Sequence, residues 1–299
     1  MTQTGFSRRR VLQIGAALPL VGLSTGAAQA VPVARWHGVA LGAEAQIVLA
    51  GMSRDEAAPI FAMVRDEIAR LEGIFSLYQA HSGLSQLNVM GRLKTPMPEF
   101  LEVLSLAKSV WQASNGVFDP SIQPIWQARA EGRTVARSHD FGAVRFSAQD
   151  VTLAPGMALT LNGVAQGYIT DRVALLLRGQ GLTDLVVDAG EQRALGARPG
   201  GTDWRLGVAD PQGKIVAQLS LRDRALATSS PEGTLIGAGQ GHIIDGRTGA
   251  SVARWGTVSV AHDSAAVADA LSTAACCLDD AQMADMLAQF DGATLAYRG

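Results

Sequence analysis

The chain has 299 residues, of which 47% are hydrophobic and 17% charged, and its formal net charge is -2. This length allows a sizeable core, and one or two domains are expected at about 100–200 residues each. A general nucleic-acid binder needs a strongly basic face, and this near-neutral composition argues against one. We therefore expect a globular protein with no nucleic-acid partner.

The first residues have the pattern of an export signal. Ser7–Leu12 is a twin-arginine signature, the apolar run extends from Val11 to Leu23, and Ala28–Ala30 supplies a small-residue cleavage site. The apolar run is shorter than the ~20 residues that span a bilayer, so we expect no stable membrane insertion. We predict a signal peptide over residues 1–30 and a mature periplasmic domain over residues 31–299, exported by the twin-arginine route. The alternative is a cytoplasmic protein with a fortuitous basic start.

The first half of the chain contains both strand and helix patterns. A strand pair with a bend at Gly42 is expected over residues 36–49, and apolar residues at three- and four-residue steps predict a helix over residues 55–75. Pro98 opens a second helix that stops at Asn115-Gly116. Irregular connections are expected over residues 76–88, 117–120 and 127–150, the last with a short strand around Arg145.

The second half of the chain is richer in strands. A helix is expected to end at Gly179, and later helices are expected over residues 264–278 and 281–290, before a closing strand. Strands are expected over residues 185–188, 204–210, 217–221, 225–227, 242–245 and 257–261. Because strands and helices mix without a strict βαβ repeat, we predict an α+β fold with a single mixed α/β domain. The adjacent Cys276 and Cys277 are unsuited to a disulfide and are expected to be small buried residues of a helix.

The stretch Leu161–Arg172 combines two glycines with the start of an apolar helical run. Gly163 and Gly167 permit a close approach of the backbone, and the free N–H groups at a helix start favour anions. The stretch matches neither a Walker loop nor a G-x-G-x-x-G fingerprint. The functional interpretation is contact with a phosphate or a metal, and the alternative is an ordinary strand-to-helix turn.

Asp269 and Thr273 form the sharpest candidate pair. They are four residues apart on a predicted helix and therefore share one face. A carboxylate and a hydroxyl are hard oxygen ligands that suit Mg²⁺ or Ca²⁺ rather than zinc. The same spacing is common on solvated helices, but the flanking residues here are apolar, which makes a merely solvated aspartate less natural.

The segment from Gly241 to Gly249 and the hydroxyl-rich Ala227–Ser230 contain the remaining candidate groups. His242 could donate to a phosphate or carry a proton near neutral pH, although a lone histidine before an apolar pair is more often structural. The sequence contains no convincing Ser-His-Asp or Cys-His nucleophile set, and the spacing of zinc ligands is missing.

Several short stretches, in order along the chain, carry a family resemblance. They are Phe75-Ser76-x-Tyr78 through Ser82 to Asn88, Gly116–Pro120, Gly163–Tyr168 with Asp171, Ala189–Glu191, Trp204–Pro211, Ala227–Ser229, His242–Asp245 with Arg247–Gly249, and Ala268–Thr273. Together they resemble the FAD:protein FMN transferases, the ApbE-like flavin transferases. The resemblance implies an ApbE-like domain with a flavin cleft.

Members of that family bind FAD with Mg²⁺ and move its FMN half onto a threonine or serine hydroxyl of an acceptor protein, releasing AMP. By this resemblance the metal ligands are Asp269, Thr273 and the backbone carbonyl of Gly163, and the catalytic candidates are Asp269 and His242. The resemblance implies cofactor contacts by Leu41, Tyr78, Asn88, Val117, Phe118, Asp119, Thr160, Gln166, Ser229, His242 and Ile243. Because the FAD pyrophosphate is negatively charged, a metal that neutralises it could supply much of the catalysis.

The chain departs from the family pattern at three positions. Thr160 stands where the family usually has an aspartate, Gln166 replaces a frequent lysine or glutamate, and Gly246 replaces a proline. Gln166 and the Ala189–Glu191 turn are similar to the NosX branch, which serves nitrous-oxide respiration. That branch implies a role in the maturation of nitrous-oxide reductase, with a NosR-like membrane flavoprotein as the acceptor.

Three other interpretations stay open. Water could replace the acceptor hydroxyl, which would make the protein a Mg²⁺-dependent FAD hydrolase. The changes at Thr160 and Gln166 could spare binding and weaken turnover, which would leave a non-catalytic periplasmic FAD-binding maturation factor. Finally, Asp245–Ala250 looks like an Asp-x-x-Thr-Gly-Ala acceptor signature, which would make Thr248 a site of self-flavinylation. The transferases carry a similar segment as part of their own fold.

Overall fold

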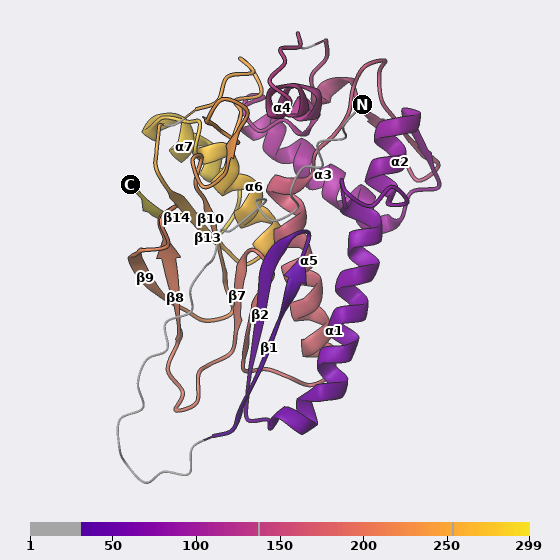
Figure 1. Cartoon of the computed structure of the whole chain (residues 1–299). Helices are drawn as coiled ribbons and strands as arrows, with labels where there is room; N and C mark the ends of the chain where they lie inside the picture. The colour runs from indigo at the N-terminus through magenta and orange to yellow at the C-terminus, as the bar shows by residue number, and fades with distance from the viewer. Residues whose placement is uncertain (1–30, 137, 253) are drawn as a thin grey trace.

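The computed structural model describes residues 31–299 except residues 137 and 253, so the predicted signal peptide lies outside the described residues. The centre of the fold is a seven-stranded sheet in which all neighbouring pairs are antiparallel (Figure 1). In spatial order its strands are β1 (Val33–Ala40), β2 (Ala43–Ala50), β6 (Leu185–Asp188), β7 (Gln192–Leu195), β10 (Ala225–Ser229), β13 (Val258–His262) and β14 (Thr294–Arg298).

Helices cover one face of this sheet and a hairpin covers the other. The helices are α1 (Arg54–Phe75), α5 (Asn162–Gly179) and α6 (Ala265–Ala275). The hairpin is formed by β8 (Trp204–Ala209) and β9 (Ile215–Leu221). Because strand side chains alternate, Ile47 and Leu49 of β2 enter the core beneath the helices, whereas Val48 packs with Trp204 of the hairpin. The sheet is therefore buried on both faces.

Shorter elements surround one end of this core. Figure 1 shows α2, α3 and α4 gathered beyond the end of the long helix α1. The remaining elements are α2 (Gly83–Met90), α3 (Pro98–Ala113), α4 (Gln123–Ala130), α7 (Asp280–Leu287), the 3-10 turns η1 (Pro120–Ile122) and η2 (Phe141–Ala143), a small sheet of β3 (Arg92–Lys94), β5 (Asp150–Thr152) and β4 (Arg145–Phe146), and a hairpin of β11 (Leu235–Ile236) and β12 (Gln240–Gly241).

The structure confirms the predicted α+β class and the long helices, and it corrects three local predictions. The irregular connection expected over residues 76–88 contains most of α2, which starts where the Ser82 hydroxyl accepts a hydrogen bond from the N–H of Ser85. The helix α4 occupies the start of the segment interpreted as a connector. Residues 242–245 do not form a strand, because the N–H of His242 donates to the loop carbonyls of Pro231 and Thr234. The segment has only an isolated β-bridge, between Ile244 and Ser251.

Two further features bear on the sequence predictions. Cys276 and Cys277 are buried free thiols at the end of α6. Within residues 31–299, the two gaps aside, no helix has the length and apolar character needed to cross a bilayer.

Candidate functional site

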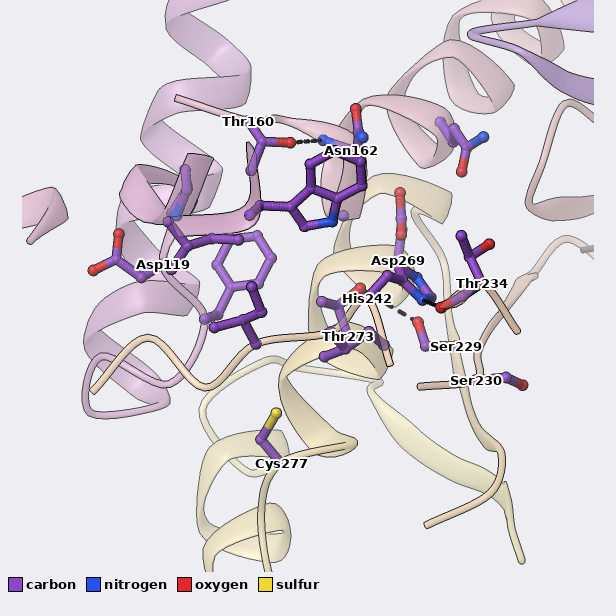
Figure 2. A pocket seen from close by; sticks show the side chains of 18 of the residues that line it. Asp119, Thr160, Asn162, Ser229, Ser230, Thr234, His242, Asp269, Thr273 and Cys277 are labelled. Carbon is purple, nitrogen blue, oxygen red and sulfur yellow. Dashed lines mark hydrogen bonds between the residues drawn. The ribbon is translucent and has the colours of Figure 1, made fainter. Parts of the chain in front are cut away.

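A pocket of about 1140 Å³, open solvent at its mouth included, lies beside the N-terminal part of α5 and the side of α6 (Figure 2). Its walls come from the β1–β2 turn, the loop after α1, the segment from Val117 to α4, and the segment between β10 and Ile244. Figure 2 shows the side chains of Asp269, Thr273 and His242 in the same part of this pocket. Residues that are far apart in sequence therefore meet here.

The pocket floor lies where α5 crosses α6. A Cβ on Gly167 would come within 2.3 Å of the carbonyl oxygen of Ala265, so the two backbones meet closely because residue 167 is glycine. The N–H of Gly167 donates to Oδ2 of Asp269 at 3.0 Å. One turn earlier, Gly163 has φ of -88° and ψ of 22°, which kinks the start of α5. A Cβ on Gly163 would lie 3.0 Å from Oγ1 of Thr273, so this glycine packs directly against the threonine. Both glycines therefore lie inside α5.

The register of the two helices is fixed by Asp171 of α5. Its carboxylate accepts hydrogen bonds from the N–H groups of Ala265, at 2.9 Å, and Ala266, at 3.1 Å, in the first turn of α6. Arg193 of β7 forms an ion pair with the same carboxylate. A carboxylate at a helix N-terminus satisfies free N–H groups and is favoured by the helix dipole. Asp171 therefore holds α6 in place over α5, and with it the side chains that α6 presents to the pocket.

The three predicted metal ligands fit a hard divalent cation. Asp269 is 2% exposed, and burial raises its pKa to about 7 although the N–H of Gly167 opposes the shift. Its Oδ1 has no hydrogen-bond partner among the described residues, so one carboxylate oxygen is available to a ligand. The part of the chain that the structure describes contains no cluster of three His, Cys, Asp or Glu side chains arranged for a metal. A site of one carboxylate with a hydroxyl and a carbonyl suits Mg²⁺, which retains waters and substrate oxygens in its shell.

Two more acidic side chains are buried nearby, Glu191 beside Asp269 and Asp188 beside Glu191. Burial and the charge of Asp269 raise the pKa of Glu191 well above its usual range, and its carboxylate accepts a hydrogen bond from the N–H of Thr228 at 3.0 Å. Burial likewise raises the pKa of Asp188 to about 6. Among the described residues that line the pocket there is no lysine or arginine. An anionic pyrophosphate would therefore need a bound cation to enter this part of the pocket.

His242 is held in one tautomer by two backbone carbonyls. Its Nδ1 lies 3.1 Å from the carbonyl oxygen of Pro231 and 3.2 Å from that of Thr234. Because a carbonyl can only accept, we assign the ring proton to Nδ1, which leaves Nε2 with a free lone pair. Burial lowers the pKa of His242, so the ring is neutral near pH 7. This arrangement favours acceptance of a proton by Nε2 over donation to a phosphate.

The loop Val117–Asp119 is held against Gly246. The carboxylate of Asp119 accepts from the N–H of Ser121 at 2.7 Å, and the N–H of Gly246 donates to the carbonyl of Val117 at 2.9 Å. A Cβ on Gly246 would lie 2.4 Å from the carbonyl oxygen of Gly116 and 2.5 Å from Cβ of Asp119. The absence of a side chain at Gly246 therefore allows the loop to pack closely against this residue.

Asn88 does not line the pocket. Its Nδ2 donates to the carbonyl of Leu159 at 2.8 Å, and its Oδ1 accepts from the N–H of the same residue at 2.7 Å. In Figure 2 the adjacent Thr160 accepts a hydrogen bond from the N–H of Asn162, at 3.3 Å. The amide of Asn88 thus positions the segment that carries Thr160, and a contact of Asn88 with the flavin stays a prediction.

The other predicted site residues all line this one pocket. They are Leu41, Tyr78, Val117, Phe118, Asp119, Thr160, Gly163, Gln166, Ser229, His242, Ile243, Asp269 and Thr273. The lining also contains residues that were not predicted as site residues, namely Pro120, Ile122, Trp126, Asn162, Glu191, Thr228, Ser230, Thr234, Ile244 and Cys277. The signal in the sequence that could have indicated Trp126 is a large aromatic residue in a polar stretch. For Glu191 the signal is its place in the Ala189–Glu191 turn, one of the stretches that carry the family resemblance. Thr248 is exposed and is not among the lining residues.

Comparison with known proteins assigns the chain to a family. The family model described as the ApbE family matches residues 41–297, so the chain belongs to the ApbE family. The protein named FAD:protein FMN transferase in Chlamydia pneumoniae is 29% identical over 227 residues, which are 67% of this chain and 71% of that protein. The protein of the same name in Klebsiella pneumoniae (strain 342) is 27% identical over 229 residues, which are 68% of this chain and 69% of that protein.

Solved structures share the fold. The flavin transferase ApbE from Vibrio cholerae superposes with a TM-score of 0.74 at 21% identity, over 90% of this chain and 98% of that one. The ApbE protein from Thermotoga maritima superposes with a TM-score of 0.75 at 23% identity, over 87% of this chain and 92% of that one. These similarities confirm the predicted ApbE-like mixed α/β domain.

Proposed function

We propose that this chain is an FAD:protein FMN transferase that requires Mg²⁺, moves the FMN half of FAD onto a threonine or serine hydroxyl of an acceptor protein, and releases AMP. The name shared by its curated relatives supports the reaction class. The observation that carries the proposal is the meeting of Asp269, Thr273 and Gly163 with His242 in one pocket. Hard oxygen ligands and a proton acceptor are what such a transfer needs from the protein.

In the proposed reaction the acceptor oxygen forms a bond to the phosphorus of the FMN half, and the bond from that phosphorus to the bridging oxygen breaks. AMP leaves with the bridging oxygen, and the hydroxyl proton goes to Nε2 of His242. When bound at Gly163, Asp269 and Thr273, Mg²⁺ would neutralise the pyrophosphate charge. Phe118 and Ile243 supply apolar surface in the same pocket, which would favour a planar ring over water.

We further propose a setting for this reaction. The export pattern of residues 1–30 supports action in the periplasm after transport by the twin-arginine route. The similarity of Gln166 and the Ala189–Glu191 turn to the NosX branch supports a NosR-like acceptor and a role in the maturation of nitrous-oxide reductase. In that setting the acceptor would be anchored in the membrane while the transferase itself is not.

The test supplies the exported protein with FAD and Mg²⁺, with and without a NosR-type periplasmic domain. Flavin fluorescence in a denaturing gel reports protein-bound flavin, and chromatography reports AMP. Transfer predicts flavin on the acceptor and an equal amount of AMP, both lost when the acceptor hydroxyl is removed. AMP without bound flavin would indicate a hydrolase, and bound FAD without AMP would indicate a carrier. Flavin on this chain that disappears in Thr248→Ala would indicate self-modification.

A further inference from the structure

The turn between β1 and β2 holds a bulky residue in a conformation that glycine normally occupies. Leu41 has φ of 47° and Gly42 has φ of 86°, which is the pattern of a two-residue type I′ turn. Asn or Gly is usual at the first of these positions, and a bulky apolar residue there is strained. Such strain persists where the surroundings hold it, and it is concentrated at ligand sites. The side chain of Leu41 lines the pocket.

The contact that holds this turn comes from Glu72 of α1. The N–H of Leu41 donates to Oε1 of Glu72 at 2.7 Å, a short bond to a charged acceptor. The second carboxylate oxygen, Oε2, accepts from Nε2 of Gln79 at 3.3 Å. Gln79 directly follows Tyr78, which also lines the pocket. One carboxylate therefore links two pocket walls that come from separate segments of the chain.

The placement of Glu72 is not explained by the stability of α1. It lies in the last turn of that helix, which carries no basic residue and where the helix dipole disfavours a carboxylate. The loop that follows has its own support, because the hydroxyl of Ser76 accepts from the N–H groups of Tyr78, at 3.1 Å, and Gln79, at 3.2 Å. The loop would therefore keep hydrogen bonds without Glu72. The strained turn at Leu41, in contrast, depends on Glu72 for the hydrogen bond to the N–H of Leu41.

We propose that Glu72 is a positioning residue of the flavin pocket, whose carboxylate fixes the separation between Leu41 and Tyr78. This inference rests on the proposed function, in which the pocket binds FAD. Glu72 does not line the pocket itself, so it acts through the two segments that it bridges. A loss of this bridge would loosen both walls before FAD binds and would cost affinity, whereas the metal ligands and His242 would keep their places. The expected effect is on FAD binding rather than on the step that follows.

The test compares Glu72→Ala and Glu72→Gln with a matched control, Glu67→Ala, on the same helix. Glu67 pairs with Arg70 and does not line the pocket. Fluorescence titration gives the Kd of FAD without any acceptor, and steady-state transfer gives kcat and KM. We expect Glu72→Ala to raise Kd and KM about tenfold or more, with kcat within about twofold. Glu72→Gln keeps an oxygen for the N–H of Leu41, so its Kd and KM should lie close to the parental values. Glu67→Ala should have the parental Kd, KM and kcat.

Coupling to the turn separates this role from a general loss of structure. Leu41→Gly relaxes the strained turn, so Glu72→Ala should weaken FAD binding less in the Leu41→Gly background than in the parent. The proposal is overturned if Glu72→Ala and Leu41→Gly change the Kd of FAD independently of each other, or if Glu72→Ala binds FAD with the parental Kd. It is also overturned if Glu72→Ala lowers kcat and leaves KM unchanged. If Glu72→Ala does not fold, Glu72→Leu, which keeps apolar bulk on the helix but offers no oxygen to the N–H of Leu41, gives the same comparison with Leu41→Gly. A parent that binds FAD but transfers nothing would refute the proposed function, while the Kd series would still decide the role of Glu72.

Discussion

The N–H of Gly167 donates to Oδ2 of Asp269 at 3.0 Å, across the crossing of α5 and α6. In a regular helix this N–H would donate to the carbonyl of Gly163, four residues earlier. Because this N–H bonds to Asp269 and α5 is kinked at Gly163, the carbonyl of Gly163 is less engaged as an acceptor within the helix. One contact therefore orients the carboxylate and helps to release the carbonyl, so the two halves of the candidate metal site are assembled together.

We expect Gly167→Ala to separate the two helices. The added Cβ would meet the carbonyl oxygen of Ala265 at 2.3 Å and Cα of Ala266 at 2.7 Å, and neither backbone can move without shifting α6. The free energy of unfolding should fall by about 2 kcal/mol. The affinity for Mg²⁺ should fall about tenfold, because the N–H that orients Asp269 moves with the helix. Thermal unfolding and calorimetric titration with Mg²⁺ measure the two effects.

The matched control is Gly179→Ala, at the other end of α5, where a Cβ would meet nothing within 4 Å. This variant should bind Mg²⁺ as the parent does and be at least as stable. Parental Mg²⁺ affinity in Gly167→Ala would contradict the assembly described above.

Gly246→Ala is expected to displace the loop Val117–Asp119. The new methyl group would lie 2.4 Å from the carbonyl oxygen of Gly116, and the hydrogen bond from residue 246 to Val117 would be strained. Because this loop lines the pocket, we expect the Kd of FAD to rise about tenfold. Thr248→Ala, two residues away, removes only the hydrogen bond from the N–H of Ala250 at 3.1 Å and should leave FAD binding unchanged. Equal FAD affinity in the two variants would show that the close packing at Gly246 does not matter for the pocket.

Asp188 should make the metal-free protein less stable as the pH rises. Its pKa in the folded protein is raised by burial to about 6, whereas the unfolded value is near 3.8. Below about pH 4 both states bind the proton, and between pH 4 and pH 6 the folded state alone retains it, so stability falls through this window. The loss is at most about 3 kcal/mol. Urea unfolding in EDTA at a series of pH values measures it.

The comparison for this prediction is Asp188→Asn, which keeps an oxygen for the N–H of Gly190 but does not titrate. Buried acids such as Glu191 change stability in the same direction, so the difference between parent and variant is the informative quantity. Asp285→Asn, on the exposed side of α7, should retain the full pH dependence of the parent. A parental pH dependence in Asp188→Asn would show that this carboxyl is ionised in the folded protein.

The parts of the site that sequence could predict depend on local spacing or on family resemblance. Asp269 and Thr273 share a helix face because the helical period requires it. The contact between Gly167 and Asp269 joins residues 102 positions apart, and no local pattern encodes it. The same is true of Glu191, whose burial depends on how β7 and β10 pair around it.

Short elements account for most of the errors in the fold. The helix α4 has eight residues with Pro124 in its first turn, so its apolar side chains complete too few turns to show a period. For this reason the sequence did not indicate that Trp126, in this helix, is part of a pocket wall. His242–Asp245 contains two adjacent isoleucines, which favour a strand. The ring and backbone of His242 instead bond to the carbonyls of Pro231 and Thr234, so the segment is part of a loop.

The central claim is that Asp269, with Thr273 and the carbonyl of Gly163, holds the Mg²⁺ on which FMN transfer depends. The most direct measurement is the rate of flavin attachment to an acceptor domain as a function of Mg²⁺ concentration, for the parent and for Asp269→Asn. The variant keeps an oxygen for the N–H of Gly167, so its thermal unfolding should remain cooperative. We predict a loss of at least about a hundredfold in rate at all Mg²⁺ concentrations. Parental transfer by Asp269→Asn, with the same dependence on Mg²⁺, would contradict the claim.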